Sequence, residues 1–285
     1  LLCLFAASPA AHAAISLNGP STSGWLSLGA NYDFLKDQQT GDPSSDIVGN
    51  ASNPGFFTSF DNAGTPSLTD GFIGFRIRLD DRGGNTNKTE FDRNLWVGID
   101  ADLSGSIDAF LGLNMQGSTK ELAIFAPGTG ANTSPSTTTI SNSPAFTYTP
   151  TASNYNYRAV NHLTDGGTSS DLTPTTTGDP DYYVSFMVPF ANVVSFLNSG
   201  KNPISINEHT SLRYVLATST SSNSLNQDLG GVNGGVNSTS TWTALGGFSP
   251  TISAGGQIVA PIPECSVSLL ALVGSVVGFG FSRRR

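Results

Sequence analysis

The sequence predicts an all-β fold, an antiparallel β-sandwich or jelly roll with one short helix, and a single membrane helix at the C-terminus. Three observations support the β fold. Apolar side chains recur at every second position in many short segments, Gly, Asn, Asp and Pro bound those segments, and helical spacing is almost absent. An apolar run near the end of the chain predicts the membrane helix.

The clearest strand covers residues 73–79, where apolar side chains alternate with Gly74, Arg76 and Arg78. Because successive side chains of a strand point to opposite faces, we expect the apolar face in the core and the arginines toward solvent. The same alternation predicts further strands at residues 95–99, 107–115, 122–124, 182–188 and 212–216.

One helix is expected at residues 189–200. Pro189 stands at its start, apolar residues follow at spacings of three and four, and Gly200 ends the pattern. We expect this helix to close one open end of the sandwich. Residues 128–156 and 218–256 are rich in Ser, Thr, Gly and Asn, which predicts long surface loops that carry only short strands.

Residues 1–13 have the features of a secretory signal peptide. Residues 1–7 are apolar, and Ala11 and Ala13 form a small-x-small cleavage site, so the mature chain is expected to begin at residue 14. No initiating Met or basic region precedes the apolar run, so we expect the signal peptide to be truncated at its front. A single β-sandwich domain is then expected at residues 14–255, followed by a linker at 256–260.

A short apolar run at residues 267–281 precedes a basic cluster that consists of Arg283, Arg284 and Arg285. As a helix, the run would cover ~22 Å, less than the ~30 Å hydrocarbon core of a bilayer. We therefore expect a temporary membrane insertion in which the arginines stay on the cytoplasmic side.

A short Pro-Glu motif stands just before this run, at Pro263 and Glu264, and is followed by Cys265. The order of motif, marginal helix and arginine cluster closely resembles the PEP-CTERM sorting signal of bacterial exosortase substrates. Cys265 replaces the family's second proline. The resemblance covers residues 261–285 and implies that an exosortase-type transpeptidase recognises the motif and removes the tail. An ordinary C-terminal tail anchor is the alternative.

The amino-acid composition argues against several classes of function. The two cysteines, Cys3 and Cys265, lie outside the expected domain, which excludes disulfides and cysteine-bound zinc from it. The formal net charge of −8 disfavours nucleic acid and anionic lipid as partners. His162 and His209 are the histidines of the domain, and neither belongs to a nucleophile motif, so we do not expect an enzyme.

The sharpest chemical signal is an acidic stretch between two expected strands. It resembles the start of an EF-hand calcium loop, with a glycine at position 6 and candidate ligands at Asp100, Asp102, Ser104, Ser106 and Asp108. Position 12 is Leu111, where a bidentate Glu should close the shell, so a remote acid such as Glu90, Asp92 or Glu121 would have to replace it. The alternative is a bare turn whose side chains bind backbone amides.

The three tryptophans are Trp25, Trp96 and Trp242. Trp96 alternates with the apolar positions of its strand and is a candidate ligand residue, because an indole on the outer surface could stack against a sugar ring. The alternative is that all three tryptophans pack inside the protein.

The stretch from residue 70 to 231 loosely resembles exported bacterial β-sandwich modules related to family-nine carbohydrate-binding modules and DOMON-like domains. The segments concerned are residues 75–80, 96–100, 181–189 and 217–230. This resemblance implies a sandwich and leaves the ligand open.

We therefore expect an exported structural or adhesive protein of the bacterial cell surface or extracellular matrix. The alternatives are a carbohydrate-binding module that attaches to envelope or extracellular polysaccharide and, third, a secreted glycosidase. Calcium is the one cofactor that the sequence suggests.

Overall fold

The computed structural model describes residues 14–28, 33, 35–39, 42–82, 90–128, 139–172, 179–234, 236–237 and 239–256. The predicted signal peptide at residues 1–13 lies outside the described residues, and so do the predicted sorting motif, membrane segment and arginine cluster.

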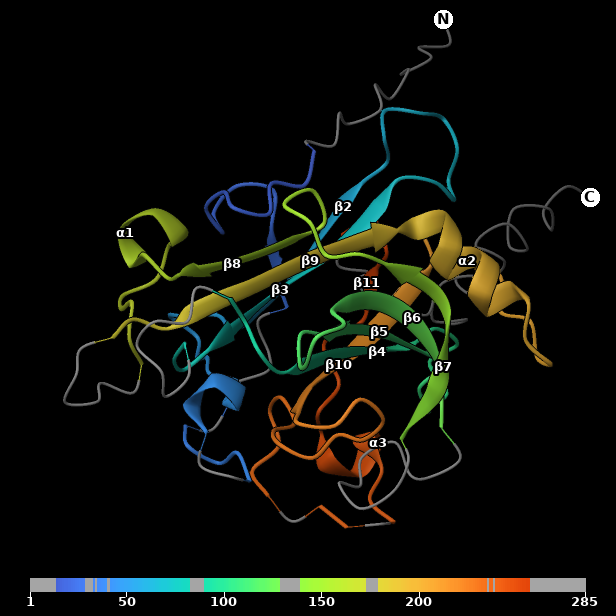
Figure 1. Ribbon diagram of the computed structural model, residues 1–285. Coiled ribbons are helices and arrows are strands. Elements are labelled where there is room, and N and C mark those ends of the chain that lie inside the picture. Colours follow the sequence, from blue (N-terminus) through green and yellow to red (C-terminus); the bar gives the residue numbers. More distant parts are fainter. Residues whose placement is uncertain are drawn as a thin grey trace, which may run out of the picture.

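The described residues form two antiparallel sheets, which confirms the prediction of a mainly β protein (Figure 1). The five-stranded sheet has the order β1-β2-β3-β9-β8. Its strands are β1 (Leu26–Ser27), β2 (Phe56–Asp61), β3 (Phe72–Leu79), β9 (Tyr182–Pro189) and β8 (Tyr155–Ala159).

The six-stranded sheet has the order β11-β10-β4-β5-β6-β7. Strands β4 to β7 follow one another along the chain as a meander, and β10 pairs with the other edge of β4. The strands are β11 (Ile252–Ser253), β10 (Ser211–Ser219), β4 (Asn94–Asp100), β5 (Ala109–Asn114), β6 (Glu121–Pro127) and β7 (Ile140–Tyr148).

The largest hydrophobic core takes side chains from both sheets. On β3, the apolar side chains at residues 73, 75, 77 and 79 are all fully buried in this core, as their alternation predicts. Phe75 packs edge-on against Tyr214 of β10 with 5.1 Å between ring centroids, so the two sheets meet at this pair.

The predicted helix is confirmed as α2 (Phe190–Asn198), which begins directly after β9. Its residues Phe190, Val193 and Leu197 are buried in the core, and Figure 1 places the helix at one end of the sheets. The prediction of only one helix is wrong, because the described residues also include two four-residue helices, α1 (His162–Asp165) and α3 (Trp242–Leu245), and the 3-10 turn η1 (Pro43–Ser45).

The prediction that residues 128–156 carry only short strands is also wrong, because β7 has nine residues. It pairs with β6 through an irregular register and leaves most of its Ser- and Thr-rich side chains partly or fully exposed. An exposed edge strand needs no alternating apolar face, so its composition does not distinguish it from a loop.

The expectation that Arg76 and Arg78 face solvent is corrected, because both side chains are buried. They do lie on the outer face of β3, but other segments cover that face. Arg76 donates to the carbonyl oxygen of Leu17 at 2.8 Å and lies over the ring of Trp25 at 4.3 Å. Burial lowers the pKa of Arg76 to about 10, a value that leaves the guanidinium charged near neutral pH.

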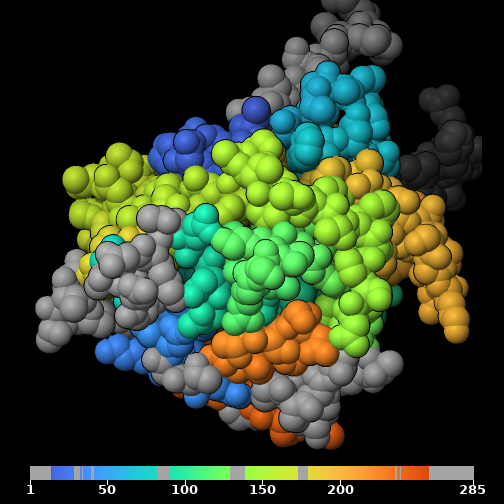
Figure 2. Space-filling view, in the orientation of Figure 1, coloured from blue at the N-terminus to red at the C-terminus, as the bar shows by residue number. Residues whose placement is uncertain are grey.

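The outer face of the six-stranded sheet is covered as well, in this case by the segment that follows β10. A second hydrophobic cluster joins Trp96 and Phe110 of the sheet to Leu225, Leu229 and Trp242 of that segment. In Figures 1 and 2 the orange segment lies against the lower part of the green strands. The predicted loop at residues 218–256 is therefore long and poor in strands, as expected, and it also contributes to a core.

Candidate functional site

The acidic stretch predicted as a calcium loop forms the hairpin between β4 and β5, and we call it the hairpin cluster: Asp100, Asp102 and Asp108. Each of the three supplies a carboxylate oxygen, and these oxygens lie within 4.8 Å of one another. Asp100 is buried, Asp108 is half-buried and Asp102 is exposed. The three acids of the predicted stretch thus lie close together.

Backbone amides of the turn occupy much of this oxygen shell. Asp108 Oδ2 accepts from the amide of Ala101 at 2.7 Å, and Asp102 Oδ1 accepts from the amide of Ser104 at 3.0 Å. Ser104 Oγ in turn accepts from the amide of Ser106 at 3.3 Å. These bonds are those expected of a self-capped turn.

Arg213 of β10 also binds the hairpin cluster. Its Nε donates to Asp100 Oδ2 at 2.7 Å, and its Nη2 donates to the carbonyl oxygen of Leu103 at 3.2 Å. Asp100 is fully buried, and its other carboxylate oxygen, Oδ1, is buried with no hydrogen-bond partner. A calcium ion bound here would have to share Asp100 with this guanidinium, so calcium at the hairpin cluster stays a prediction.

The ligand that should close the calcium shell at position 12 of this loop is not supplied by Leu111 or by one of the suggested remote acids. Leu111 is fully buried in the core between the sheets, so position 12 cannot close the shell. Of the described acids, Glu90, Asp92 and Glu121 do not belong to the group of oxygens within 4.8 Å. Glu90 pairs with Lys120, and Asp92 pairs with Arg93.

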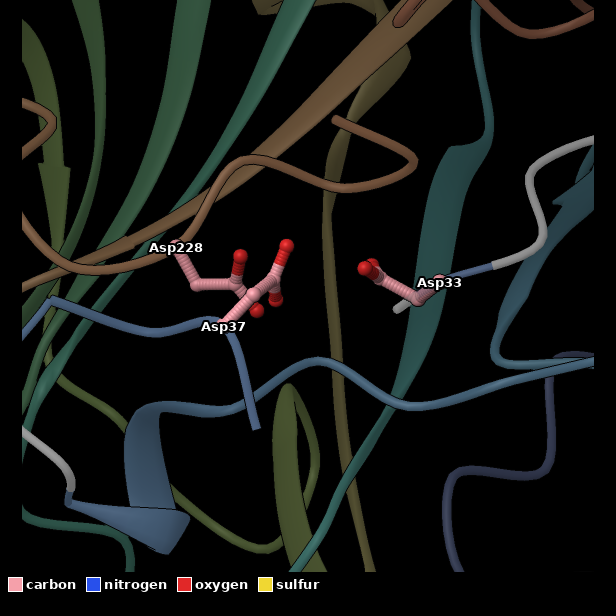
Figure 3. Close-up of side chains that lie close together, drawn as sticks. All are labelled: Asp33, Asp37 and Asp228. Atoms are coloured by element: carbon pink, nitrogen blue, oxygen red, sulfur yellow. The ribbon is translucent and has the colours of Figure 1, made fainter. Parts of the chain in front are cut away.

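Sequence reasoning missed a second acidic group, in which Asp33, Asp37 and Asp228 bring carboxylate oxygens within 4.8 Å of one another. Asp33 and Asp37 precede η1, whereas Asp228 lies in the loop after β10. Figure 3 shows the carboxylates of Asp37 and Asp228 close together, with that of Asp33 pointing toward them from the other side. No local motif joins these residues, so no sequence spacing could have identified the group.

A third group contains Asp80, Asp171 and Asp181. Here a buried arginine supplies a positive charge, because Arg78 Nε donates to Asp181 Oδ2 at 2.5 Å. Burial, followed by the charges of neighbouring acids, raises the pKa of Asp80 to about 7. Burial also raises the pKa of Asp181 to about 6, against the lowering effect of Arg78.

The candidate role of Trp96 as an outer-surface platform for a sugar is wrong, because its side chain is 1% exposed. The indole packs edge-on against Phe125 and over Gly112, where an added Cβ would lie 1.9 Å from the ring. The alternative that all three tryptophans pack inside is confirmed, since Trp25 and Trp242 are buried too.

Comparisons of the chain with protein-family models, with curated proteins and with solved structures found no match. Among the helices that the structure describes, none has both the length and the apolar character needed to span a bilayer.

Proposed function

We propose that this protein is an exported structural or adhesive component of a bacterial cell surface or extracellular matrix. The observation that carries the proposal is the C-terminal order of Pro-Glu motif, short apolar run and three arginines. An exosortase-type transpeptidase would recognise Pro263, Glu264 and Cys265 after the arginines have halted the chain in the inner membrane. The apolar run at residues 267–281 would be the single membrane helix, inserted only until the tail is removed.

The body would then be a β-sandwich module. Two antiparallel sheets share one core, and segments of the same chain cover parts of both outer faces. The tryptophan proposed as a sugar platform is buried. These observations support a structural role for the module more than binding of polysaccharide through an exposed indole.

The test is the intact mass of the mature protein, isolated from the envelope or matrix of its native cells. We expect a mass that lacks residues 1–13 and the tail beyond the Pro-Glu motif, and any attached sugar would appear as an added mass. A matched variant with Glu264→Gln should keep its tail and remain in the membrane fraction. Recovery of the uncut chain from the cytosol would contradict the proposal.

A glycan array with the purified protein tests the alternative independently. If the protein binds a polysaccharide specifically and a Trp96→Phe variant still binds it, the result would favour a carbohydrate-binding module with a site other than Trp96. Cleavage of the glycan would favour the glycosidase. We expect neither.

A further inference from the structure

Four aspartates from three separate segments form what we call the interloop cluster: Asp33, Asp37, Asp46 and Asp228. The first two lie in the segment before η1, Asp46 directly follows η1, and Asp228 lies in the loop after β10. Asp33, Asp37 and Asp228 have mutually close carboxylate oxygens (Figure 3). Asp46 is near enough that its charge raises the pKa of Asp228.

Hydrogen bonds fix the three segments to one another around these acids. The amide of Ile47 donates to Asp228 Oδ2 at 2.7 Å, although 181 residues separate the two positions. The amide of Gly231 likewise donates to Asp33 Oδ2 at 3.1 Å across 198 residues. The cluster is therefore a built feature of the tertiary structure, and it lies where distant parts of the chain meet.

Several oxygens of the interloop cluster are buried without a partner. Asp46 is 0% exposed, and its Oδ2 accepts from the amide of Lys36 at 2.9 Å while its Oδ1 accepts nothing. Both carboxylate oxygens of Asp37 are buried and accept no hydrogen bond, and the same holds for Oε1 of the neighbouring Gln38. Buried polar atoms are nearly always satisfied, so this set of acceptors requires an explanation.

In the part of the chain that the structure describes, the ion pairs formed by arginine, lysine and histidine side chains go to other carboxylates, and none of them involves Asp37, Asp46 or Asp228. Lys36 is next to Asp37 in the sequence but is exposed. The third acidic group differs, because Arg78 donates to it directly.

The burial of these aspartates close to one another raises their pKa values. Burial raises the pKa of Asp46 to about 6, and the charge of Asp37 adds to the effect. Burial also raises the pKa of Asp228 well above its ordinary value, with further contributions from the charges of Asp37 and Asp46. These raised pKa values reflect the burial and the close approach of like charges in the cluster.

We propose that the interloop cluster is a calcium site. Carboxylate and amide oxygens, without histidine or cysteine, suit a hard cation. Asp33, Asp37 and Asp228 offer oxygens that lie close together, Asp46 is near them, and water from the partly exposed segment at residues 35–39 can complete the six to eight oxygens that calcium takes. Calcium tolerates irregular geometry better than magnesium, which fits ligands drawn from three segments. A bound ion would tie the segment before η1 to the loop after β10.

The test compares the melting temperature of the purified full chain in EDTA and in calcium. With free calcium at about 100 times the dissociation constant, the ion should raise the melting temperature by about 5 °C or more. Asp37→Asn is the informative variant, because its carboxylate has no described hydrogen bond to lose. This variant should fold in EDTA, lose the calcium-induced rise and bind calcium at least tenfold more weakly in calorimetry.

Asp102→Asn in the hairpin cluster is the matched control, and it should keep the calcium-induced rise. An unchanged wild-type melting curve would overturn the proposal, as would a full rise in Asp37→Asn. Loss of the rise in Asp102→Asn alone would assign calcium to the hairpin instead. An equal rise with magnesium would overturn the assignment of the ion. Intact mass of the native protein reports the proposed sorting, so the two proposals can fail separately.

Discussion

The hairpin cluster and the interloop cluster each gather three carboxylates within the same distance, but they differ in their described counter-charges. Arg213 pairs with Asp100 of the hairpin, whereas no described ion pair involves Asp37, Asp46 or Asp228. Arg213 and the amides of the turn satisfy most of the hairpin oxygens. In the interloop cluster, Asp37 and one oxygen of Asp46 have no donor. The comparison teaches that a resemblance to a calcium loop in sequence is a weaker indication of a bound ion than buried acids that the fold leaves without partners.

Substitution of Arg213 tests the difference between the two clusters most directly. Asp100 is fully buried, so Arg213→Met would leave its charge without a counter-charge and should cost about 4 kcal/mol of the free energy of unfolding in EDTA. Denaturant unfolding of the wild type and the variant measures this loss. Calcium should restore part of the stability if the hairpin cluster can accept the ion once the guanidinium is gone.

Arg93→Met is the control for this substitution. Arg93 pairs with Asp42 and Asp92, and all three side chains are partly exposed, so the loss should be at most about 1 kcal/mol. Equal effects of the two substitutions would show that Arg213 is not specially required and would remove the contrast between the clusters.

The pH dependence of stability in EDTA should also distinguish the two clusters, with a somewhat smaller change in the free energy of unfolding than Arg213→Met causes. The pKa of Asp46 is about 6 in the folded protein, above its ordinary value of 3.8, so the folded state holds more protons between these values. Stability from this group is present below pH 4 and is lost as the pH rises through 6. Each pKa unit corresponds to about 1.4 kcal/mol, which gives a loss of about 3 kcal/mol at most.

Calcium should cancel this loss at the interloop cluster, because the ion replaces the proton. Asp80, with a pKa of about 7, should lose its own contribution at slightly higher pH regardless of calcium. Asp165 behaves in the opposite sense, since Arg158 helps to hold its pKa at about 2 against burial, and its stabilisation is lost only in acid. Denaturant unfolding at pH 4.5 and 7.5 measures the effect, and a calcium-free protein more stable at pH 7.5 would contradict this account.

Patterns among residues close in sequence predicted the strands, the helix and the hairpin that such residues form. Alternation identified β3, helical spacing identified α2, and the spacing of acids within one short stretch identified the hairpin cluster. The alternation also separated the two faces of β3 and β4 correctly. It could not show that other parts of the chain cover the outer faces. For this reason Arg76 was expected at the surface and Trp96 was a candidate for it, although both are buried.

The interloop cluster could not be predicted for a related reason. Its members become neighbours only when the segment before η1 and the loop after β10 pack together, through bonds such as that from Ile47 to Asp228. An isolated aspartate in a polar loop has no distinctive sequence context, and its burial is decided by residues far away in the chain. Tertiary contacts therefore create the interloop cluster, the part of the molecule that we propose binds a cation.

A crystal structure of the protein grown with calcium, with anomalous scattering recorded from the bound ion, tests the central claim most directly. We expect an anomalous peak among the carboxylates of Asp33, Asp37, Asp46 and Asp228, with the ion bound to at least three of them. A peak only at the hairpin cluster, or no ordered calcium in either cluster, would contradict the account.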